Sequence, residues 1–145
     1  MPDAVGTGFI KLADGAVLKL RILIVDVKEM GFSPFGGVNF EVRVVGGIAT
    51  HLIPRELKEA VADKPIVPPT QQLPQEGWEI VDIVEQQPAV AEEVVESSKG
   101  RFRIKVVAEA VMVARNTKYK SAHGEPVYWV SWVYKTSWKP VEEKA

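Results

Sequence analysis

The chain has 145 residues, of which 46% are apolar and 26% are charged, and its formal net charge is −1. This size and balance are typical of one globular domain and exclude a disordered or fibrous chain. The chain contains no cysteine, which excludes disulfides, thiolate metal sites and thiol nucleophiles.

The first predicted element is a β-hairpin. Residues 9–12 and the residues from Val17 onward read as strands, and Asp14-Gly15 supplies a positive-φ turn position between them. Apolar and basic residues alternate in the second strand until the phase of the pattern slips. A slip of one residue moves the following side chains to the other face, so we predict a β-bulge near Leu23.

A loop, a strand and a helix follow. Residues 30–37 contain Pro34 and three glycines, including the pair Gly36-Gly37, and predict a loop. Residues 38–44 alternate between apolar and polar side chains, which predicts a half-buried strand ended by Gly46-Gly47. Residues 54–63 begin with proline and carry apolar residues at helical spacing, so we predict a short helix there.

The middle of the chain is predicted to contain a loop, a strand, a helix and a second strand. Residues 65–77 hold four prolines and one glycine and predict a long Pro-rich surface loop. We predict a strand at residues 78–85 and a second, acidic helix at residues 88–98. Residues 101–113 alternate between basic and apolar side chains and predict a long strand, with a phase slip at 106–107.

The C-terminal third is read as a basic loop at residues 115–124, a last strand at 127–138 and a short charged tail at 140–145. Residues 1–139 are expected to form a single domain. The predicted fold class is α+β, mainly β: a curved antiparallel sheet or partly open barrel of about six strands with one or two short helices.

Aromatic residues concentrate in the last predicted strand. Residues 127–138 contain three of the four tryptophans and two of the three tyrosines. At a period of two, Tyr128 and Trp132 share one face and Trp129 lies on the other. Such a strand is either sandwiched in a core or presents an aromatic face to a partner. The sequence leaves both interpretations open.

The charges are unevenly distributed along the chain. Residues 55–98 carry ten acids against three bases, or 3 − 10 = −7, and residues 99–139 carry nine bases against two acids, or 9 − 2 = +7. The basic segment is typical of a surface that binds a polyanion. Alternatively, acidic elements lie against the basic ones and neutralise them.

The motifs of common catalytic and cofactor sites are missing. His51 and His123 stand alone in the sequence, the serines lack a nucleophile-elbow context, and Gly36-Gly37 precedes a strand rather than a phosphate-binding helix. We therefore expect a protein that is not an enzyme and that binds no metal and no small-molecule cofactor. Without a secretory signal or a run of ~20 apolar residues, we expect it to be cytoplasmic, with no membrane partner.

The basic segment interleaves cations with aromatic residues. Sheet surfaces that bind single-stranded nucleic acid use aromatic rings to stack on bases and cations to contact phosphates. We therefore predict a non-catalytic nucleic-acid-binding domain that prefers single strands. The predicted contacts are Arg101, Arg103, Lys105, Arg115, Lys118, Tyr119, Lys120, Tyr128 and Trp132.

The alternative is a homo-oligomeric structural or adaptor protein that uses the aromatic C-terminal strand for protein–protein contact. Tyrosine and tryptophan are enriched in interface cores, and a strand that is apolar on both faces is suited to pairing copies. We expect a homodimer in this case. Sparse asparagine and abundant valine, glutamate and proline are compatible with a thermophilic source.

Overall fold

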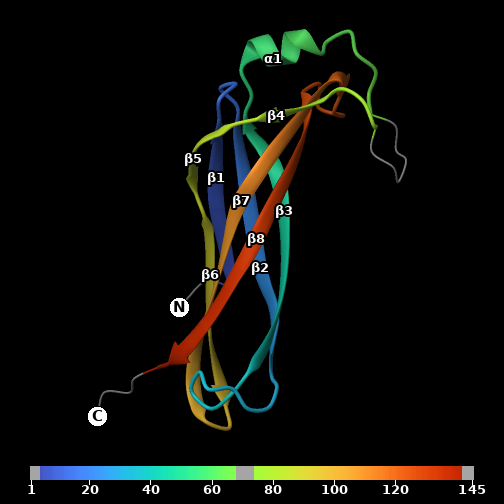
Figure 1. The fold of residues 1–145 in the computed structure, drawn as a ribbon. Helices are drawn as coiled ribbons and strands as arrows, with labels where there is room; N and C mark the ends of the chain where they lie inside the picture. Colours follow the sequence, from blue (N-terminus) through green and yellow to red (C-terminus); the bar gives the residue numbers. More distant parts are fainter. Residues whose placement is uncertain (1–3, 68–73, 142–145) are drawn as a thin grey trace.

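The structure is a computed structural model that describes residues 4–67 and 74–141. These residues form eight strands and one helix, and the molecule is elongated along its strands (Figure 1). Helix α1 (Arg55–Ala60) lies at one end. The strands are β1 (Val5–Leu12), β2 (Val17–Glu29), β3 (Phe40–Leu52), β4 (Trp78–Val81), β5 (Ile83–Gln87), β6 (Ala89–Ser97), β7 (Gly100–Lys120) and β8 (Pro126–Pro140).

The strands form two antiparallel sheets that face each other as a sandwich. Sheet A has the hydrogen-bonding order β3-β2-β1-β5. In sheet B, β7 is central: β8 pairs along one edge, and β6 and β4 pair one after the other along the opposite edge. Side chains from both sheets meet in one apolar cluster between them.

One short stretch of chain joins the two sheets. β4 and β6 belong to sheet B but β5, which lies between them in the chain, belongs to sheet A. On β5, Gln86 donates from Nε2 to the Ala110 carbonyl and accepts from the Ala110 backbone N–H, both at 3.0 Å. This part of β7 lies between the residues that pair with β6 and those that pair with β4. The amide of Gln86 therefore satisfies backbone groups that those two strands leave unpaired.

Two glycines on β1 allow the backbone of residues 87–90, where β5 leads into β6, to pass close to β1. A Cβ atom at Gly6 would lie 2.2 Å from the Val90 carbonyl oxygen, and one at Gly8 would lie 2.2 Å from the Gln87 carbonyl oxygen. Only glycine fits at such a backbone-to-backbone approach. The sandwich is therefore closed on the β5–β6 side. On the opposite side, β3 pairs only with β2 and β8 only with β7 among the described residues.

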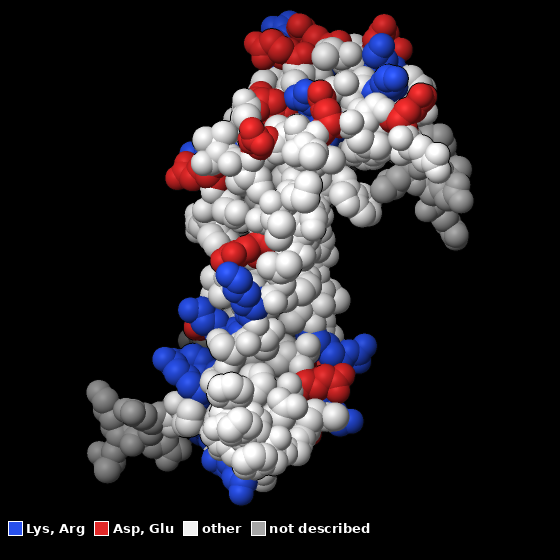
Figure 2. Space-filling model, in the orientation of Figure 1, with Lys and Arg blue, Asp and Glu red and all other residues white. Residues whose placement is uncertain are grey.

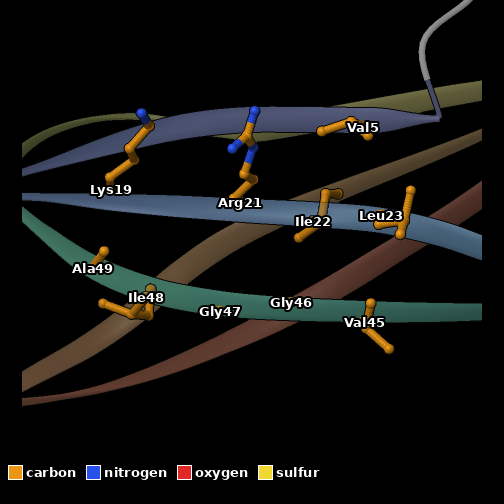
Figure 3. Close-up of a pocket in the computed structure, with 10 residues that line it drawn as sticks. All are labelled: Val5, Lys19, Arg21, Ile22, Leu23, Val45, Gly46, Gly47, Ile48 and Ala49. Carbon is orange, nitrogen blue, oxygen red and sulfur yellow. The ribbon is translucent and has the colours of Figure 1, made fainter.

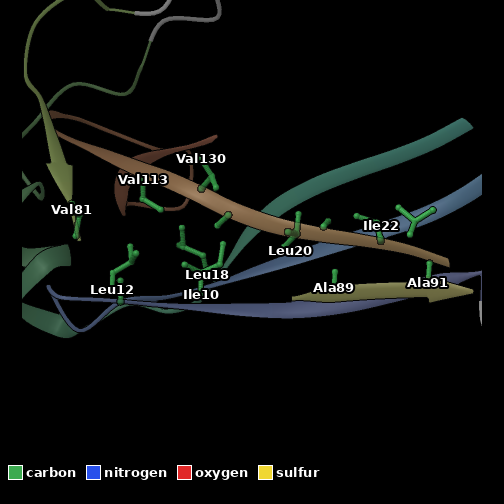
Figure 4. Packing of buried hydrophobic residues seen from close by; sticks show 14 of the residues in the cluster. Ile10, Leu12, Leu18, Leu20, Ile22, Val81, Ala89, Ala91, Val113 and Val130 are labelled. Atoms are coloured by element: carbon green, nitrogen blue, oxygen red, sulfur yellow. The ribbon is translucent and has the colours of Figure 1, made fainter. Parts of the chain in front are cut away.

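The core follows the alternation of the strands. Leu18, Leu20 and Ile22 on β2 and Ile10 on β1 point between the sheets toward β7 and β8, where Val113 and Val130 meet them (Figure 4). A second cluster fills the end away from the helix: Val38, Phe40, Phe102 and Ile104 are buried, and Trp138 packs against them. The Phe40 ring meets the Phe102 and Trp138 rings edge to face, at centroid distances of 5.4 and 5.5 Å.

Both predicted phase slips exist, but each lies a few residues further along the chain. In β2 the register shifts between Ile24 and Asp26, so the bulge lies after the expected position near Leu23. In β7 the register shifts between Ala110 and Met112, because small buried alanines continue the inward alternation past residues 106–107. Because alanine is a weak hydrophobic signal, the alternation is hard to follow beyond residue 107, and the predicted slip lies too early in the chain.

The second predicted helix is wrong: residues 88–98 contain strand β6. The stretch is rich in alanine and glutamate, which favour a helix, but β6 pairs with β7 over nine residue pairs from Ala89–Ala108 to Ser97–Gly100. Tertiary pairing overrides the local propensity. The predicted short helix at residues 54–63 is present as α1.

The predicted basic loop is also wrong. Residues 115–120 continue strand β7, so Arg115, Lys118, Tyr119 and Lys120 lie on a strand, and the turn is confined to residues 121–125. Strand β3 likewise runs through Gly46-Gly47 instead of ending there. The predicted strand at 78–85 is divided at Asp82 into β4 and β5, which join different sheets.

The coarse prediction is confirmed: the protein is mainly β, with antiparallel sheets and one short helix. The expected six strands and the partly open barrel are not confirmed, since the eight described strands form two sheets. The middle of the Pro-rich loop and the end of the charged tail lie outside the described residues. No helix in the described part of the chain is long and apolar enough to cross a membrane.

Candidate interaction surfaces

The structure divides the nine predicted nucleic-acid contacts into two groups on β7 and β8. Arg101, Arg103 and Lys105 lie in the first part of β7, near the end away from α1, and the others lie toward the helix end, except that Trp132 pairs with Ala110 at the middle of β7. From Arg103 to Lys118 is 15 residues of strand, or roughly 50 Å at about 3.3 Å per residue. The two groups therefore do not form one compact site.

Two of the helix-end residues, Arg115 and Tyr128, form hydrogen bonds inside the protein. Arg115 donates from one guanidinium nitrogen to Asp14 Oδ2 at 2.9 Å and from Nε to Glu79 Oε1 at 3.0 Å. The Tyr128 hydroxyl donates to the same Asp14 Oδ2 at 2.8 Å. The side chains of Arg115 and Asp14 are only 17% and 9% exposed. Arg115 and Tyr128 are thus members of an internal network rather than of an open surface.

The network shifts the ionisation of two members. Burial, and then the hydrogen bond to the Asp14 carboxylate, raise the pKa of Tyr128 well above its ordinary value. Burial by itself would lower the pKa of Arg115, but its hydrogen bonds to Glu79 and Asp14 raise the pKa overall. The tyrosine is therefore neutral and the arginine charged at every physiological pH.

Of the remaining helix-end residues, Lys120 is bonded to neighbouring loops, whereas Lys118 is exposed. Lys120 donates from Nζ to the Ala62 carbonyl at 3.0 Å, and its backbone bonds to Pro65 and Val67. The methylene groups of Lys118 lie close to Gly77, within about 3 Å of where a Cβ there would be. Tyr119 is partly buried.

The basic group at the other end lies on the outer face of sheet B. Lys139 is the cross-strand partner of Arg103, and the two cations line a shallow hollow together with Lys105 and Trp138. Acids on β6 are adjacent: Glu92 pairs in register with Lys105, and Glu96 forms an ion pair with Arg101 at 3.5 Å. The acidic segment of the sequence thus supplies a strand that partly neutralises the basic strand beside it.

Trp132 and Trp129 have different environments, although they are three residues apart on β8. Trp132 is partly buried against the core, where it meets Tyr134 edge to face. Trp129 lies on the outer face of sheet B and is 54% exposed. The prediction chose Trp132 for a surface role, whereas the structure exposes Trp129. The period-two pattern does place the two residues on opposite faces, but it does not say which face is outward.

Trp129 belongs to an exposed apolar patch at mid-length of sheet B. Ile80 and Trp129 are the cross-strand neighbours of Ala114 on its two sides, and Met112 lies on the same face of β7 one step further along. We call this the waist patch. Its exposed members are Ile80, Val111, Met112, Trp129 and Val133.

Charged residues flank the waist patch. Figure 2 views this side of the molecule and shows a zone with few charges at mid-length, with most Asp and Glu gathered toward α1 and mainly Lys and Arg toward the other end. The ion pair of Lys135 with Glu109, at 3.0 Å, borders the patch on the basic side. Some Lys and Arg also lie at the α1 end, so along the strands the face changes from a mixed end in which Asp and Glu predominate, through the apolar waist patch, to a mainly basic end.

The outer face of sheet A is also partly apolar. An open groove of about 690 Å³ runs along β1, β2 and β3, where Gly46-Gly47 contributes no side chains. Figure 3 shows Val5, Arg21 and Leu23 on the lining of this groove. Few polar groups converge here, so the groove lacks the anchoring contacts expected of a small-molecule site.

The two histidines are not brought together. His51 packs edge to face on Phe9 at the end of β3, and His123 lies in the turn between β7 and β8. No cluster of three or more His, Asp or Glu side chains suited to a metal ion occurs in residues 4–67 and 74–141. Comparison with known proteins adds no assignment: no family model, no curated protein and no solved structure matches this chain.

Proposed function

We propose that this protein is a homo-oligomeric structural or adaptor subunit that pairs with a second copy through the outer face of sheet B. The observation that carries this proposal is the waist patch, which leaves Trp129, Met112 and Ile80 exposed side by side. Contiguous exposed apolar residues mark interaction sites, and tryptophan and methionine are enriched in interface cores.

The charge pattern favours a second copy of the same chain as the partner. A two-fold axis through the waist patch sets two copies antiparallel, so each patch packs against its own equivalent. The acidic end of one copy then lies against the basic end of the other (Figure 2). A face that runs from acidic to basic is complementary to itself in this arrangement and repelled in the parallel one.

The size of the face is sufficient for a stable dimer. β8 has 15 residues, so its length is roughly 50 Å, and three strands are roughly 14 Å wide. The face therefore offers about 700 Å² per copy, which is close to the ~800 Å² per partner of a standard interface.

The open edge of β8 adds a second means of contact. β8 is far longer than an average strand and pairs with β7 alone among the described residues. Unpaired strand edges are templates for pairing with another chain unless they are blocked. Pro126 and Pro140 block only the two ends of β8. The middle of this edge lies next to the waist patch and has no second strand partner among the described residues, although the Tyr134 hydroxyl reaches Gly46 on β3.

Two tryptophan variants test the proposal. Sedimentation equilibrium should show a dimer for the native protein and a folded 16.0 kDa monomer for Trp129→Glu. The control Val84→Glu places the same charge at an exposed apolar position on the other sheet and should leave the dimer intact. Trp132→Glu should destabilise the fold instead. A native protein that is monomeric at high concentration refutes the proposal.

Nucleic-acid binding is the second candidate, and it is supported by the side-by-side cations Arg103, Lys105 and Lys139. In this proposal these residues contact the phosphates of a single strand. Titration of a labelled oligonucleotide should then give a log affinity that falls linearly with log salt, by about 0.7 per phosphate neutralised. Arg103→Gln should reduce this slope by about one phosphate, and absence of binding at low salt refutes it.

A further inference from the structure

The loop between β2 and β3 lies at the end of the molecule away from α1 (Figure 1), and it carries two exposed phenyl rings. Phe32 is 81% exposed and Phe35 is 71% exposed, and Met30 beside them is also exposed. These are the two most exposed large apolar side chains in the described part of the chain. Neither ring lines either of the two hollows described above. We call this loop, residues 30–37, the tip.

The backbone of the tip is held in place. Gly37 N–H donates to the Ser33 carbonyl at 2.9 Å, and Phe35 N–H donates to Ser33 Oγ at 3.1 Å, while Ser33 itself is buried. Trp138 Nε1–H donates to the Phe35 carbonyl at 3.1 Å and ties the loop to β8. A Cβ at Gly36 would lie 2.7 Å from the Phe102 ring. The loop therefore packs on the core through its backbone and directs its phenyl rings outward.

One basic side chain lies beside the tip, and others lie on the neighbouring strand ends. Lys99 lies 3.9 Å from the Cβ position of Gly37, and Lys139 follows Trp138 on β8. Two hydrogen bonds from Ser98, first from its hydroxyl and then from its backbone N–H, lower the pKa of Glu29 and tie β2 to the β6–β7 hairpin. In the strand ends and turns at this end (residues 26–43, 96–103 and 137–141), six bases stand against four acids: Lys28, Arg43, Lys99, Arg101, Arg103 and Lys139 against Asp26, Glu29, Glu41 and Glu96.

We propose that the tip binds an anionic lipid surface. Phe32 and Phe35 would enter the boundary between headgroups and acyl chains, while the lysines and arginines at this end contact the anionic headgroups. Membrane binding of this type depends on buried apolar area together with attraction to anionic lipid. Aromatic rings favour this boundary region.

Shape and charge together favour a lipid surface over other occupants. Two phenyl rings this exposed offer no enclosure for a small molecule. A lipid surface deforms around exposed side chains and needs no matching pocket. The excess of bases at this end complements anionic headgroups without requiring a specific geometry. The phenyl rings of the tip lie apart from the waist patch, so their contact with lipid does not depend on the proposed dimer.

Vesicle co-sedimentation tests the proposal. The full chain is mixed with vesicles of phosphatidylcholine alone or of phosphatidylcholine with phosphatidylserine, at low and at physiological salt. We expect binding to the anionic vesicles, and a double variant Phe32→Ser/Phe35→Ser should lower the partition coefficient by about tenfold or more. The matched control Val84→Ser/Ile66→Ser removes two exposed apolar side chains elsewhere and should bind like the native protein.

Two further variants test the electrostatic part of the binding and its relation to the waist patch. Lys99→Gln/Lys139→Gln should weaken binding to anionic vesicles and do so more at low salt, because screening reduces the electrostatic part. Trp129→Glu should bind as the native protein does. The proposal is overturned if the native protein ignores anionic vesicles, or if the serine double variant binds them equally. It is also overturned if that variant changes only the sedimentation of the free protein, since the tip would then meet another copy.

Discussion

The two ends of the sandwich use aromatic and charged residues in opposite ways. At the helix end, Arg115, Tyr128 and Asp14 bond to one another across three separate segments of the chain. At the tip end, Phe32 and Phe35 face solvent, and Lys99 lies beside their loop. Similar residue types thus stabilise the fold at one end and remain available to a partner at the other.

The difference shows that residue type alone does not identify a functional surface. The helix-end residues Arg115 and Tyr128 match the aromatic-and-basic pattern expected for ligand binding, yet their polar atoms are already bonded within the protein. A side chain whose hydrogen bonds are satisfied internally must lose them before it can bind a ligand. The two ends therefore differ in whether their side chains are free to contact a partner, and not in which residue types they contain.

The largest expected effect distinguishes a buried phenylalanine from an exposed one at the tip end. Phe102→Ala removes a fully buried ring from the second core cluster and should lower the free energy of unfolding by about 4 kcal/mol. Phe32→Ala removes an exposed ring and should change it by less than about 0.5 kcal/mol. Urea denaturation followed by tryptophan fluorescence measures both. Equal losses would mean that the tip is part of the core.

The next effect compares a carboxylate at each end. Asp14→Ala should lower the free energy of unfolding by about 3 kcal/mol, because it leaves Arg115 and Tyr128 without their shared acceptor. Glu29→Ala removes an exposed carboxylate at the tip end and should lower the free energy of unfolding by much less. The same denaturation measurement compares them. A small loss for Asp14→Ala would show that the network does not stabilise the helix end.

The smallest effect is a dependence on pH at the helix end. The folded state raises the pKa of Tyr128, so its contribution to stability is fully present below the ordinary tyrosine pKa of about 10 and is lost as the pH rises above it. Stability should fall by at most about 1.4 kcal/mol per pH unit there. Tyr128→Phe should reduce this fall. Thermal unfolding at pH 8 to 11 measures it, and identical slopes would contradict the assigned role.

Much of the fold was predictable because it depends on local alternation. The hairpin turn at Asp14-Gly15, the inward residues of β2 and the short helix after Pro54 all have signals within a few residues. Strand β6 has no such signal, since its alanines and glutamates favour a helix until β7 pairs with it. Long-range pairing decides the structure of such a stretch.

The surfaces were less predictable than the strands. Arg115 and Asp14 are 101 residues apart in the chain, and nothing near either residue indicates that they form an ion pair. The exposure of Trp129 depends on which face of β8 meets sheet A, and the bulge in β7 beside it alters the register. The sequence shows that two faces exist, but only the assembled sheets determine which one is outward.

The close approach at Gly6 and Gly8 has a consequence for the order of folding. Strands β1 to β3 and β6 to β8 are each joined by connections to the next strand along the chain, so both groups can form early. β5 pairs with β1 across a much longer separation, as Phe9 pairs with Gln87. It must also fit against glycine backbone with no room for side chains. We therefore expect insertion of this strand to be the slow, rate-limiting step, and replacing either glycine with alanine to leave two formed halves that fail to dock.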